Sequence, residues 1–272
     1  MSIVVLITSV ISNMGEITAK SLADNGYIVY AGTRDIDAVP DDSSLKSIYI
    51  DITKTDSITK AVDAIVKKEG KIDVLVNNAC YGLLTTAKDE TDEEIFNQFD
   101  VNVLGLSKVT HAVLPYMREA KMREAKSGVI INISSFLGRI GLPFLAHYNA
   151  SKHAVIEGIV DSLRFETLPC NVRVHSIQAW LFGANFVKNG LLVNAQTTSE
   201  DSPYKDLISH FVPIINEGSS PQPIADAVKN IIENENSKIF VPVGIEATTV
   251  VSLRKELSDE KFEEKVKETF DI

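Results

Sequence analysis

The order of apolar segments along the chain is the feature that most restricts its fold. Strands that alternate with helices form parallel sheets, because the chain returns through a helix before it enters the next strand. Neither a linker nor a change of composition divides the sequence. We therefore predict one domain over 1–272, an α/β fold with a doubly wound parallel sheet of about seven strands and helices on both faces. The expected strands are 2–8, 27–33, 44–51, 72–79, 127–135, 171–179 and 238–244.

The first expected strand leads into a turn and then a helix. The stretch LITSVISNMG (6–15) ends on Gly15, and the pattern that follows predicts a helix over 16–25 that stops before Gly26. This order commonly binds phosphate, because a helix N-terminus offers free N–H groups and the positive end of its dipole. Ligands of such sheets bind at the carboxyl ends of the strands. The residues that end the strands there are Thr8, Thr33, Asp51, Asn78, Ser135 and Ala179.

The composition excludes several classes of function. The net charge of −10 argues against a nucleic-acid or anionic-membrane surface. No apolar segment approaches the length of a membrane span, and the N-terminal segment lacks the pattern of a signal peptide, so a cytoplasmic location is expected. Cys80 and Cys170 have no metal-ligand or redox spacing, which predicts reduced thiols and no metal site.

A tyrosine and a lysine lie four residues apart in YNASK. If 147–166 is helical, as its pattern predicts, Tyr148 and Lys152 share one face of the helix. An ammonium beside a phenol favours the phenolate, so we expect a lowered pKa for Tyr148 and a role as general acid or base. A surface pair without function is the alternative that the spacing leaves open. Ser135 in INISS and Asn102 in FDVNVLG add two polar residues upstream.

These pieces together resemble the short-chain dehydrogenase/reductase family. The resemblance runs from residue 3 to about residue 186 through Thr8…Gly15, YIDIT, NNA, Asn102, ISS…YNASK and VRVHSI, and more loosely through PQPIADAVKNII…KIFVPVG. It implies a Rossmann-like fold and an NAD(P)(H)-dependent oxidoreductase that interconverts an alcohol and a carbonyl. The branch most similar to this chain acts on steroids, retinoids and similar apolar alcohols.

The resemblance also assigns roles to the four polar residues. It makes Tyr148 the proton donor or acceptor at the substrate oxygen, and Lys152 the group that lowers its pKa and binds the nicotinamide ribose. Ser135 polarises the substrate carbonyl, and Asn102 holds a water that links Lys152 to solvent. Structural alternatives remain open for two of them, since Ser135 could cap a turn and Asn102 could stabilise a helix kink.

The cofactor residues follow from the same resemblance. The end of the second strand carries Thr33 and Arg34 where NAD-preferring members carry an acid, and a guanidinium suits a 2′-phosphate, so we expect NADP(H) in preference to NAD(H). Asp35 opposes this preference, because it could pair with Arg34. Asp51 matches the residue that meets the adenine. The implied cofactor-binding residues are Thr8, Ser9, Asn13, Met14, Gly15, Thr33, Arg34, Asp51, Ile52, Asn78, Ala79, Tyr148, Lys152, Ala179 and Trp180.

The chain departs from the family pattern in the cofactor half of the site. Ser9 and Asn13 replace two of the three glycines of the phosphate-binding turn, and we expect Asn13 to tolerate a left-handed backbone there. Cys80 replaces the glycine of NNAG, and Trp180 replaces the glycine of a Pro-Gly turn beside the nicotinamide carboxamide. The family threonine after that turn is Ala184 in this chain.

These departures leave three functional hypotheses. The chain is a working NADP(H)-dependent enzyme, a degenerate member that binds a partner or small ligand, or an enzyme that uses Tyr148 without hydride transfer. The Trp180 side chain could block the nicotinamide ring or swing outward and line the substrate pocket.

The chain after the sixth strand is expected to cover the substrate. Residues 187–222 match the family's substrate lid, with a polar and mobile middle. An apolar pocket wall and core or dimer packing are equal explanations for Leu181, Phe182, Phe186, Leu191 and Leu192. Broadly apolar helices within 92–117 and 152–168 predict a homodimer or homotetramer.

Overall fold

The structure is a computed structural model that describes residues 2–39, 44–123, 128–182, 190–216 and 219–270. Seven parallel strands form the main sheet, as predicted, and the structure arranges them in the order β3-β2-β1-β4-β6-β7-β9. These strands are β1 (Val4–Thr8), β2 (Ile28–Thr33), β3 (Leu45–Tyr49), β4 (Val74–Asn77), β6 (Gly128–Ser135), β7 (Val172–Ala179) and β9 (Phe240–Val243).

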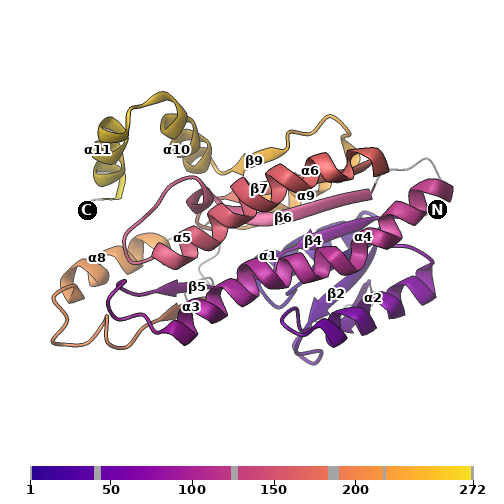
Figure 1. Ribbon diagram of the computed structural model, residues 1–272, viewed down its shortest axis with the longest axis horizontal. Coiled ribbons are helices and arrows are strands. Elements are labelled where there is room, and N and C mark those ends of the chain that lie inside the picture. The colour runs from indigo at the N-terminus through magenta and orange to yellow at the C-terminus, as the bar shows by residue number, and fades with distance from the viewer. Residues whose placement is uncertain (1, 40–43, 124–127, 183–189, 217–218, 271–272) are drawn as a thin grey trace.

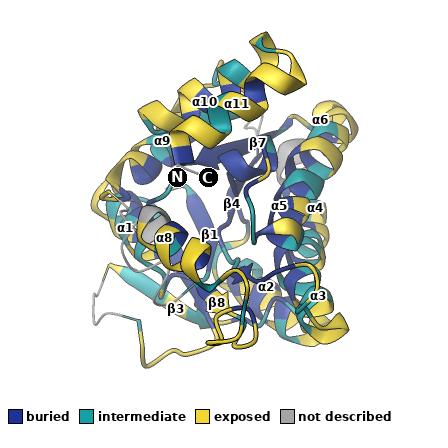
Figure 2. Ribbon diagram, turned by 90° about the vertical axis from the view of Figure 1, so that its left-hand side faces the viewer, coloured by how far each residue is buried: buried dark blue, intermediate teal, exposed yellow. Residues whose placement is uncertain are grey.

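Helices cover both faces of the sheet (Figure 1). The helices α1 (Asn13–Asp24) and α9 (Gln222–Glu233) pack together on one face, with Leu22 and Val228 in the same apolar cluster as Val5 of β1. The helices α2 (Thr55–Glu69) and α4 (Leu106–Arg123) pack together on the other. Central strands such as β1 are dark blue in Figure 2, because both of their faces are buried, whereas the edge strand β3 is partly exposed.

The long helix expected over 147–166 is present but is not regular. It consists of α5 (Ala146–His153), a π-helical turn η3 (Ala154–Val160) and α6 (Asp161–Thr167), followed by the short 3-10 turn η4 (Leu168–Cys170). A second π-helical turn, η1 (Asp100–Gly105), joins α3 (Asp92–Phe99) to α4. Such turns shift the direction of the side chains that follow them and occur often at functional sites.

Three features were not expected from the sequence. A small parallel sheet pairs β5 (Gly82–Leu84) with β8 (Leu191–Val193), so the expected substrate lid begins with a strand. The helix α8 (Lys205–Asn216) follows within the lid. Beyond β9, α10 (Ile245–Glu256) and α11 (Asp259–Phe270) form a hairpin at one end of the molecule (Figure 1). Among the described helices, none has both the length and the apolar character that crossing a membrane requires.

Candidate active site

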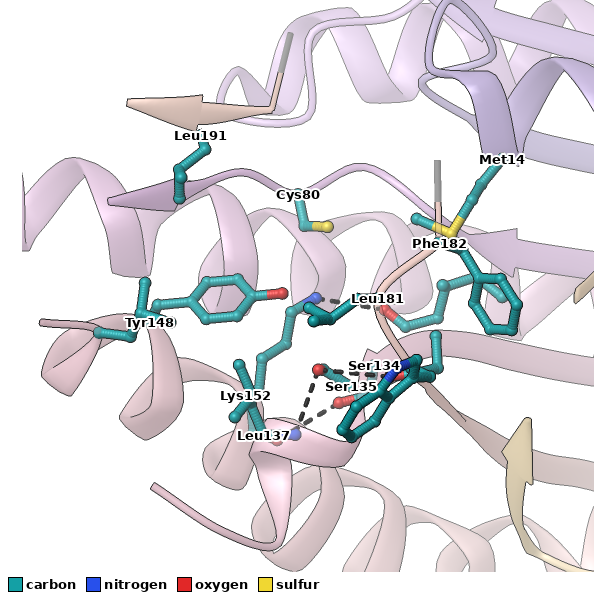
Figure 3. A pocket seen from close by; sticks show the side chains of 14 residues that line it. Met14, Cys80, Ser134, Ser135, Leu137, Tyr148, Lys152, Leu181, Phe182 and Leu191 are labelled. Atoms are coloured by element: carbon teal, nitrogen blue, oxygen red, sulfur yellow. Dashed lines mark hydrogen bonds between the residues drawn. The ribbon is translucent and has the colours of Figure 1, made fainter. Parts of the chain in front are cut away.

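A cavity opens at the carboxyl ends of β6 and β7, where α5 and β8 approach them (Figure 3). Three of the four predicted catalytic residues line it, namely Ser135, Tyr148 and Lys152. Apart from Ser134, the other described lining residues are apolar or a thiol, and none is acidic. They are Met14, Cys80, Ile133, Leu137, Leu145, Ala179, Trp180, Leu181, Phe182 and Leu191.

Tyr148 and Lys152 lie on the same face of α5, as their spacing predicted. Figure 3 shows the phenol oxygen and the ammonium nitrogen directed into the cavity toward one another. The Lys152 Nζ lies 5.6 Å from the centre of the Tyr148 ring and donates a hydrogen bond to the Ile133 carbonyl at 3.3 Å. Both residues are buried, so this is not the solvated surface pair that the spacing left open.

The expected lowering of the Tyr148 pKa is wrong for this structure. Burial in the apolar cavity raises the pKa of the phenol well above its ordinary value, and the neighbouring Cys80 adds to the rise, while a side-chain hydrogen bond with Ser135 opposes it. Removing a phenolate from water costs more free energy than the interaction with Ser135 returns. Tyr148 is therefore a neutral phenol at neutral pH.

Ser135 ends β6 and has two functions in the structure. Its Oγ accepts a hydrogen bond from the Leu137 amide at 3.1 Å, which caps the short 3-10 turn η2 (Phe136–Gly138). The same Oγ lies 3.5 Å from the carbonyl oxygen of Ala179, to which it donates. The turn-capping alternative is thus correct, and the Ser135 hydroxyl also lies near enough to Tyr148 to lower the pKa of the phenol. A substrate oxygen placed between the two would meet both hydroxyl groups.

Asn102 lies behind the cavity, within the π-helical turn η1. Its Oδ1 accepts from the Tyr81 amide at 3.0 Å, and its Nδ2 donates to the Tyr81 carbonyl at 2.9 Å and to the Ser151 hydroxyl at 3.0 Å. The Ser151 hydroxyl in turn donates to the Tyr148 carbonyl at 2.7 Å. Asn102 therefore joins the chain after β4 to the helix that carries Tyr148. Its implied role with a water stays a prediction.

The turn before α1 has kept the shape of a phosphate cradle with fewer glycines. Ser9 adopts a left-handed backbone with φ 61°, whereas Asn13 is the first helical residue, so the expectation that Asn13 occupies the left-handed position is wrong. Ser12 caps the helix, since its Oγ accepts from the Gly15 amide at 3.1 Å. A Cβ on Gly15 would lie 2.4 Å from the Ser9 carbonyl oxygen, so this glycine is required for packing.

Thr8 and Asn78 hold this cradle in place. The Thr8 hydroxyl accepts from the Asn78 and Ala79 amides, each at 3.0 Å. The Asn78 Nδ2 donates to the carbonyls of Thr8 and Ser9 and to the Ser12 hydroxyl, at 2.9–3.1 Å. The side chains of Thr8 and Asn78 thus stabilise the turn by hydrogen bonds between the ends of β1 and β4. The amides of Asn13 and Met14 belong to the first helical turn, whose N–H groups have no intrahelical acceptor.

The predicted adenine end lies after β2 and β3. Asp51 accepts from the Thr53 amide at 2.9 Å and from its hydroxyl at 2.7 Å. Burial raises the pKa of Asp51, but these bonds and the charge of the exposed Arg34 outweigh it, so the net pKa is lowered. Asp35 instead forms a tight turn in which its amide donates to the Thr33 hydroxyl at 3.0 Å. The Arg34 guanidinium therefore interacts electrostatically with the Asp51 carboxylate.

Ile52 connects the predicted adenine end to the helical segment η1, which carries Asn102. A Cβ on Gly105 of η1 would lie 2.7 Å from the Ile52 Cδ1, so η1 fits closely against that residue. The Lys108 Nζ adds a bridge, because it donates to the Thr53 carbonyl at 3.1 Å and to Asp100 at 2.9 Å. Sequence reasoning missed Lys108, since its spacing carries no signal of either contact.

Trp180 follows β7, and its side chain packs between the cavity and two buried phenyl rings. Its amide donates to the Val243 carbonyl at 3.0 Å, and its ring packs on Phe136 with 4.2 Å between ring centres and on Phe270 of α11 at 5.9 Å. The indole lines the cavity together with Ser135, Tyr148 and Lys152. That it leaves the nicotinamide site free stays a prediction. Ala184 and Phe186 lie outside the described residues.

Hydrogen bonds connect the described part of the lid to the chain around α3. Leu191 of β8 lines the cavity, whereas Leu192 points away and is 58% exposed. The Thr197 hydroxyl donates to Asp89 at 3.1 Å, and the Asn194 Nδ2 donates to both carboxylate oxygens of Glu94, at 3.1 and 3.2 Å. The polar middle of the lid, expected to be mobile, is thus anchored at two points to the chain around α3.

The sheet, the cradle and the buried Ser–Tyr–Lys group define a dinucleotide-dependent oxidoreductase of the Rossmann type. Comparison with known proteins agrees with this class. The family model described as short chain dehydrogenase matches residues 3–190. The chain belongs to the short-chain dehydrogenase/reductase family of oxidoreductases.

Individual relatives cover nearly all of the chain. It is 33% identical over 247 residues to the 3-ketodihydrosphingosine reductase of Bacteroides thetaiotaomicron, covering 89% of this chain and 87% of the relative. It is 30% identical over 247 residues to the 7alpha-hydroxysteroid dehydrogenase of Paraclostridium sordellii, covering 86% of each. A short-chain dehydrogenase structure from Streptomyces avermitilis superposes with a TM-score of 0.83 at 25% identity, over 99% of this chain and 98% of that one.

Proposed function

We propose that the protein is an NADP(H)-dependent oxidoreductase that interconverts a carbonyl and an alcohol on a small apolar substrate. The observation that carries the proposal is the convergence of Ser135, Tyr148 and Lys152 on one otherwise apolar cavity beside the end of β7. A binding protein without catalysis has no need for an ammonium and a phenol buried together in such a cavity, because burying a charge costs free energy.

The cradle fits a dinucleotide despite the lost glycines. Ser9 keeps the left-handed backbone that a glycine adopts readily, and Gly15 leaves no room for a Cβ. The amides of Asn13 and Met14 and the positive end of the α1 dipole would hold the pyrophosphate. Arg34 is exposed at the end of β2, where it would bind a 2′-phosphate. Asp51 competes for the Arg34 charge and weakens this preference without reversing it.

The residues of the chain supply the proton and the polarisation. A nicotinamide cofactor provides the hydride in reactions of this class. Ser135 donates a hydrogen bond to the substrate oxygen and stabilises the charge that develops there. Tyr148, a neutral phenol at neutral pH, gives its proton to that oxygen. Lys152 then stabilises the phenolate until a proton replaces the one transferred. The protonated Tyr148 is the form that carbonyl reduction requires.

The cavity suits an uncharged apolar ketone or alcohol. None of the described lining residues carries a carboxylate or a guanidinium that would recognise a charged head group. The names of two relatives, a 3-ketodihydrosphingosine reductase and a 7alpha-hydroxysteroid dehydrogenase, support a ketone or secondary alcohol on an apolar body. The net charge of −10 opposes a substrate delivered on an acidic carrier protein.

A homodimer or homotetramer is part of the proposal. Large apolar side chains are exposed on the segments expected to pair, with Phe96 of α3 at 62%, Phe165 of α6 at 57% and Leu168 of η4 at 67%. Exposed apolar area of this kind marks association surfaces. Light scattering that gives a monomer at micromolar concentration would contradict this part.

The enzymatic proposal is tested by a substrate screen with NADPH, in which the loss of its absorbance is followed over apolar ketones and aldehydes. The Tyr148→Phe variant should abolish turnover of the best substrate. Tyr116→Phe is the matched control, because it removes a phenol that bonds to Asp63 on the surface at 2.9 Å, far from the cavity. Unchanged turnover in Tyr148→Phe contradicts the proposal. If NADPH binds without turnover, a binding function replaces it.

A further inference from the structure

The indole of Trp180 is held by aromatic residues from two distant parts of the chain. Phe136 follows Ser135 at the end of β6, and Phe270 is the last residue of α11. Both phenyl rings are fully enclosed, with exposed fractions of 0% and 1%, and they stack with 6.5 Å between ring centres. The Trp180 ring packs on each of them, at 4.2 and 5.9 Å. Aromatic pairs in this range stabilise one another beyond simple burial.

The backbone around Trp180 is adapted to this position of the indole. Gly244 follows β9 with φ 103°, a conformation that other residues rarely adopt. A Cβ at Gly244 would lie only 2.9 Å from the Trp180 Cβ. The Trp180 amide bonds to the Val243 carbonyl, so the edge strand β9 fixes the backbone on which the indole turns. The backbone thus fixes the position of the Trp180 Cβ, and the two phenyl rings fix the orientation of the indole.

We propose that Phe270 makes the C-terminal helix α11 a part of the active site, by positioning the Trp180 indole as one wall of the cavity. The proposal rests on the proposed function. Tyr148 and Phe270 belong to one apolar cluster. Phe270 is not among the described residues that line the cavity, so α11 reaches the cavity through its contact with Trp180, which does line it. Without Phe270 the indole loses one of its two aromatic neighbours and can turn inward, toward the side of the cavity that holds Ser135.

Two consequences follow for binding. The inward indole would occupy space beside Ala179, where the resemblance places the nicotinamide, so cofactor affinity would fall in proportion to the inward population. The wall formed by the indole would also move, so an apolar ketone would lose its complementary surface. Phe270 is therefore a positioning residue, which acts on cofactor and substrate through Trp180.

The chain offers a direct probe, because Trp180 is its single tryptophan. The emission maximum and acrylamide quenching of wild type, Phe270→Ala and Phe270→Leu report where the indole lies. Phe262→Ala is the matched control, since Phe262 is also a buried ring of α11 but stacks under Arg254 instead of Trp180. We expect the emission maximum to shift and the quenching to rise in the Phe270 variants, because the indole loses the cover of one phenyl ring, with little change in Phe262→Ala. Phe270→Leu retains apolar volume and keeps the test valid if Phe270→Ala does not fold.

Calorimetric titration with NADPH then tests coupling through Trp180. Phe270→Leu should weaken NADPH binding about threefold to tenfold in the wild-type background, and should have no effect in a Trp180→Gly background. Equal weakening in both backgrounds, or an unchanged emission, overturns the proposal. If wild type binds no NADPH, the proposed function fails. The inference is then decided by the emission and by titration with the apolar ketone 2-acetylnaphthalene, whose affinity should fall in Phe270→Leu but not in Phe262→Ala.

Discussion

The substitution Gly15→Ala tests the packing of the cradle. A new Cβ would lie 2.4 Å from the Ser9 carbonyl oxygen, 2.8 Å from the Asn78 Nδ2 and 2.9 Å from the Val10 Cα. Two of these neighbours are backbone atoms and cannot rotate away. The third holds three hydrogen bonds that tie β4 to the cradle.

The cost of this substitution can be worked from those contacts. Overpacking costs about 1–3 kcal/mol, and displacing the Asn78 amide loses about 1–2 kcal/mol of hydrogen bonding. The gain from replacing a helical glycine by alanine returns about 1 kcal/mol. We therefore expect Gly15→Ala to destabilise the fold by about 1–4 kcal/mol, and to lower the melting temperature by about 2–7 °C in a chain of this size.

Gly158→Ala is the matched control for this prediction. Gly158 lies in the π-helical turn η3, is exposed, and has nothing within 4 Å of its added Cβ. The same chemical change should stabilise the fold there by about 0.5–1 kcal/mol. Thermal melts followed by circular dichroism compare the two variants with wild type. A Gly15→Ala melting temperature equal to that of wild type would refute the packing argument.

Three further predictions follow from the site. Burial raises the Tyr148 pKa above its ordinary value, so the phenol stays protonated through mildly alkaline pH. The rate of ketone reduction at saturating NADPH should therefore stay flat from pH 7 to about 9. A fall in rate over that range would contradict the raised pKa. Arg34→Asp should weaken NADPH and strengthen NADH in paired titrations, and tighter NADH binding by wild type would contradict the NADP(H) preference. Lys108→Met removes the bridge between Thr53 and Asp100 and should destabilise the fold by about 1 kcal/mol, because the ammonium is partly exposed and its ion pair is screened; urea melts measure it, and an unchanged midpoint contradicts it.

The sequence predicted the parts of the structure that local pattern determines. Most strands of the main sheet are buried along nearly their whole length. Tyr148 and Lys152 share a face because α5 is helical between them. Spacing on one helix thus placed the pair correctly. It gave the wrong direction for the Tyr148 pKa, because that depends on burial by residues far along the chain, among them Cys80 after β4 and Leu191 of the lid.

The features that sequence reasoning missed depend on contacts between distant residues. The pairing of β5 with β8 joins segments more than a hundred residues apart and is too short to leave a pattern. The contact of Phe270 with Trp180 also joins distant parts of the chain and leaves no local pattern in the sequence. Within the cradle, the family pattern indicated two replaced glycines but not which of them needs a left-handed backbone. Ser9 does, because the chain turns there, and Asn13 does not, because α1 has already begun.

The central claim is that the cradle with one glycine still holds a nicotinamide dinucleotide beside Tyr148. Isothermal titration of the wild-type protein with NADPH and with NADH tests it most directly, because the heat of binding does not depend on knowing the substrate. The account predicts one saturable site per chain for NADPH, with a dissociation constant below millimolar, and weaker binding of NADH. No binding of either dinucleotide at millimolar concentration would contradict the account and leave the fold as a scaffold for another ligand.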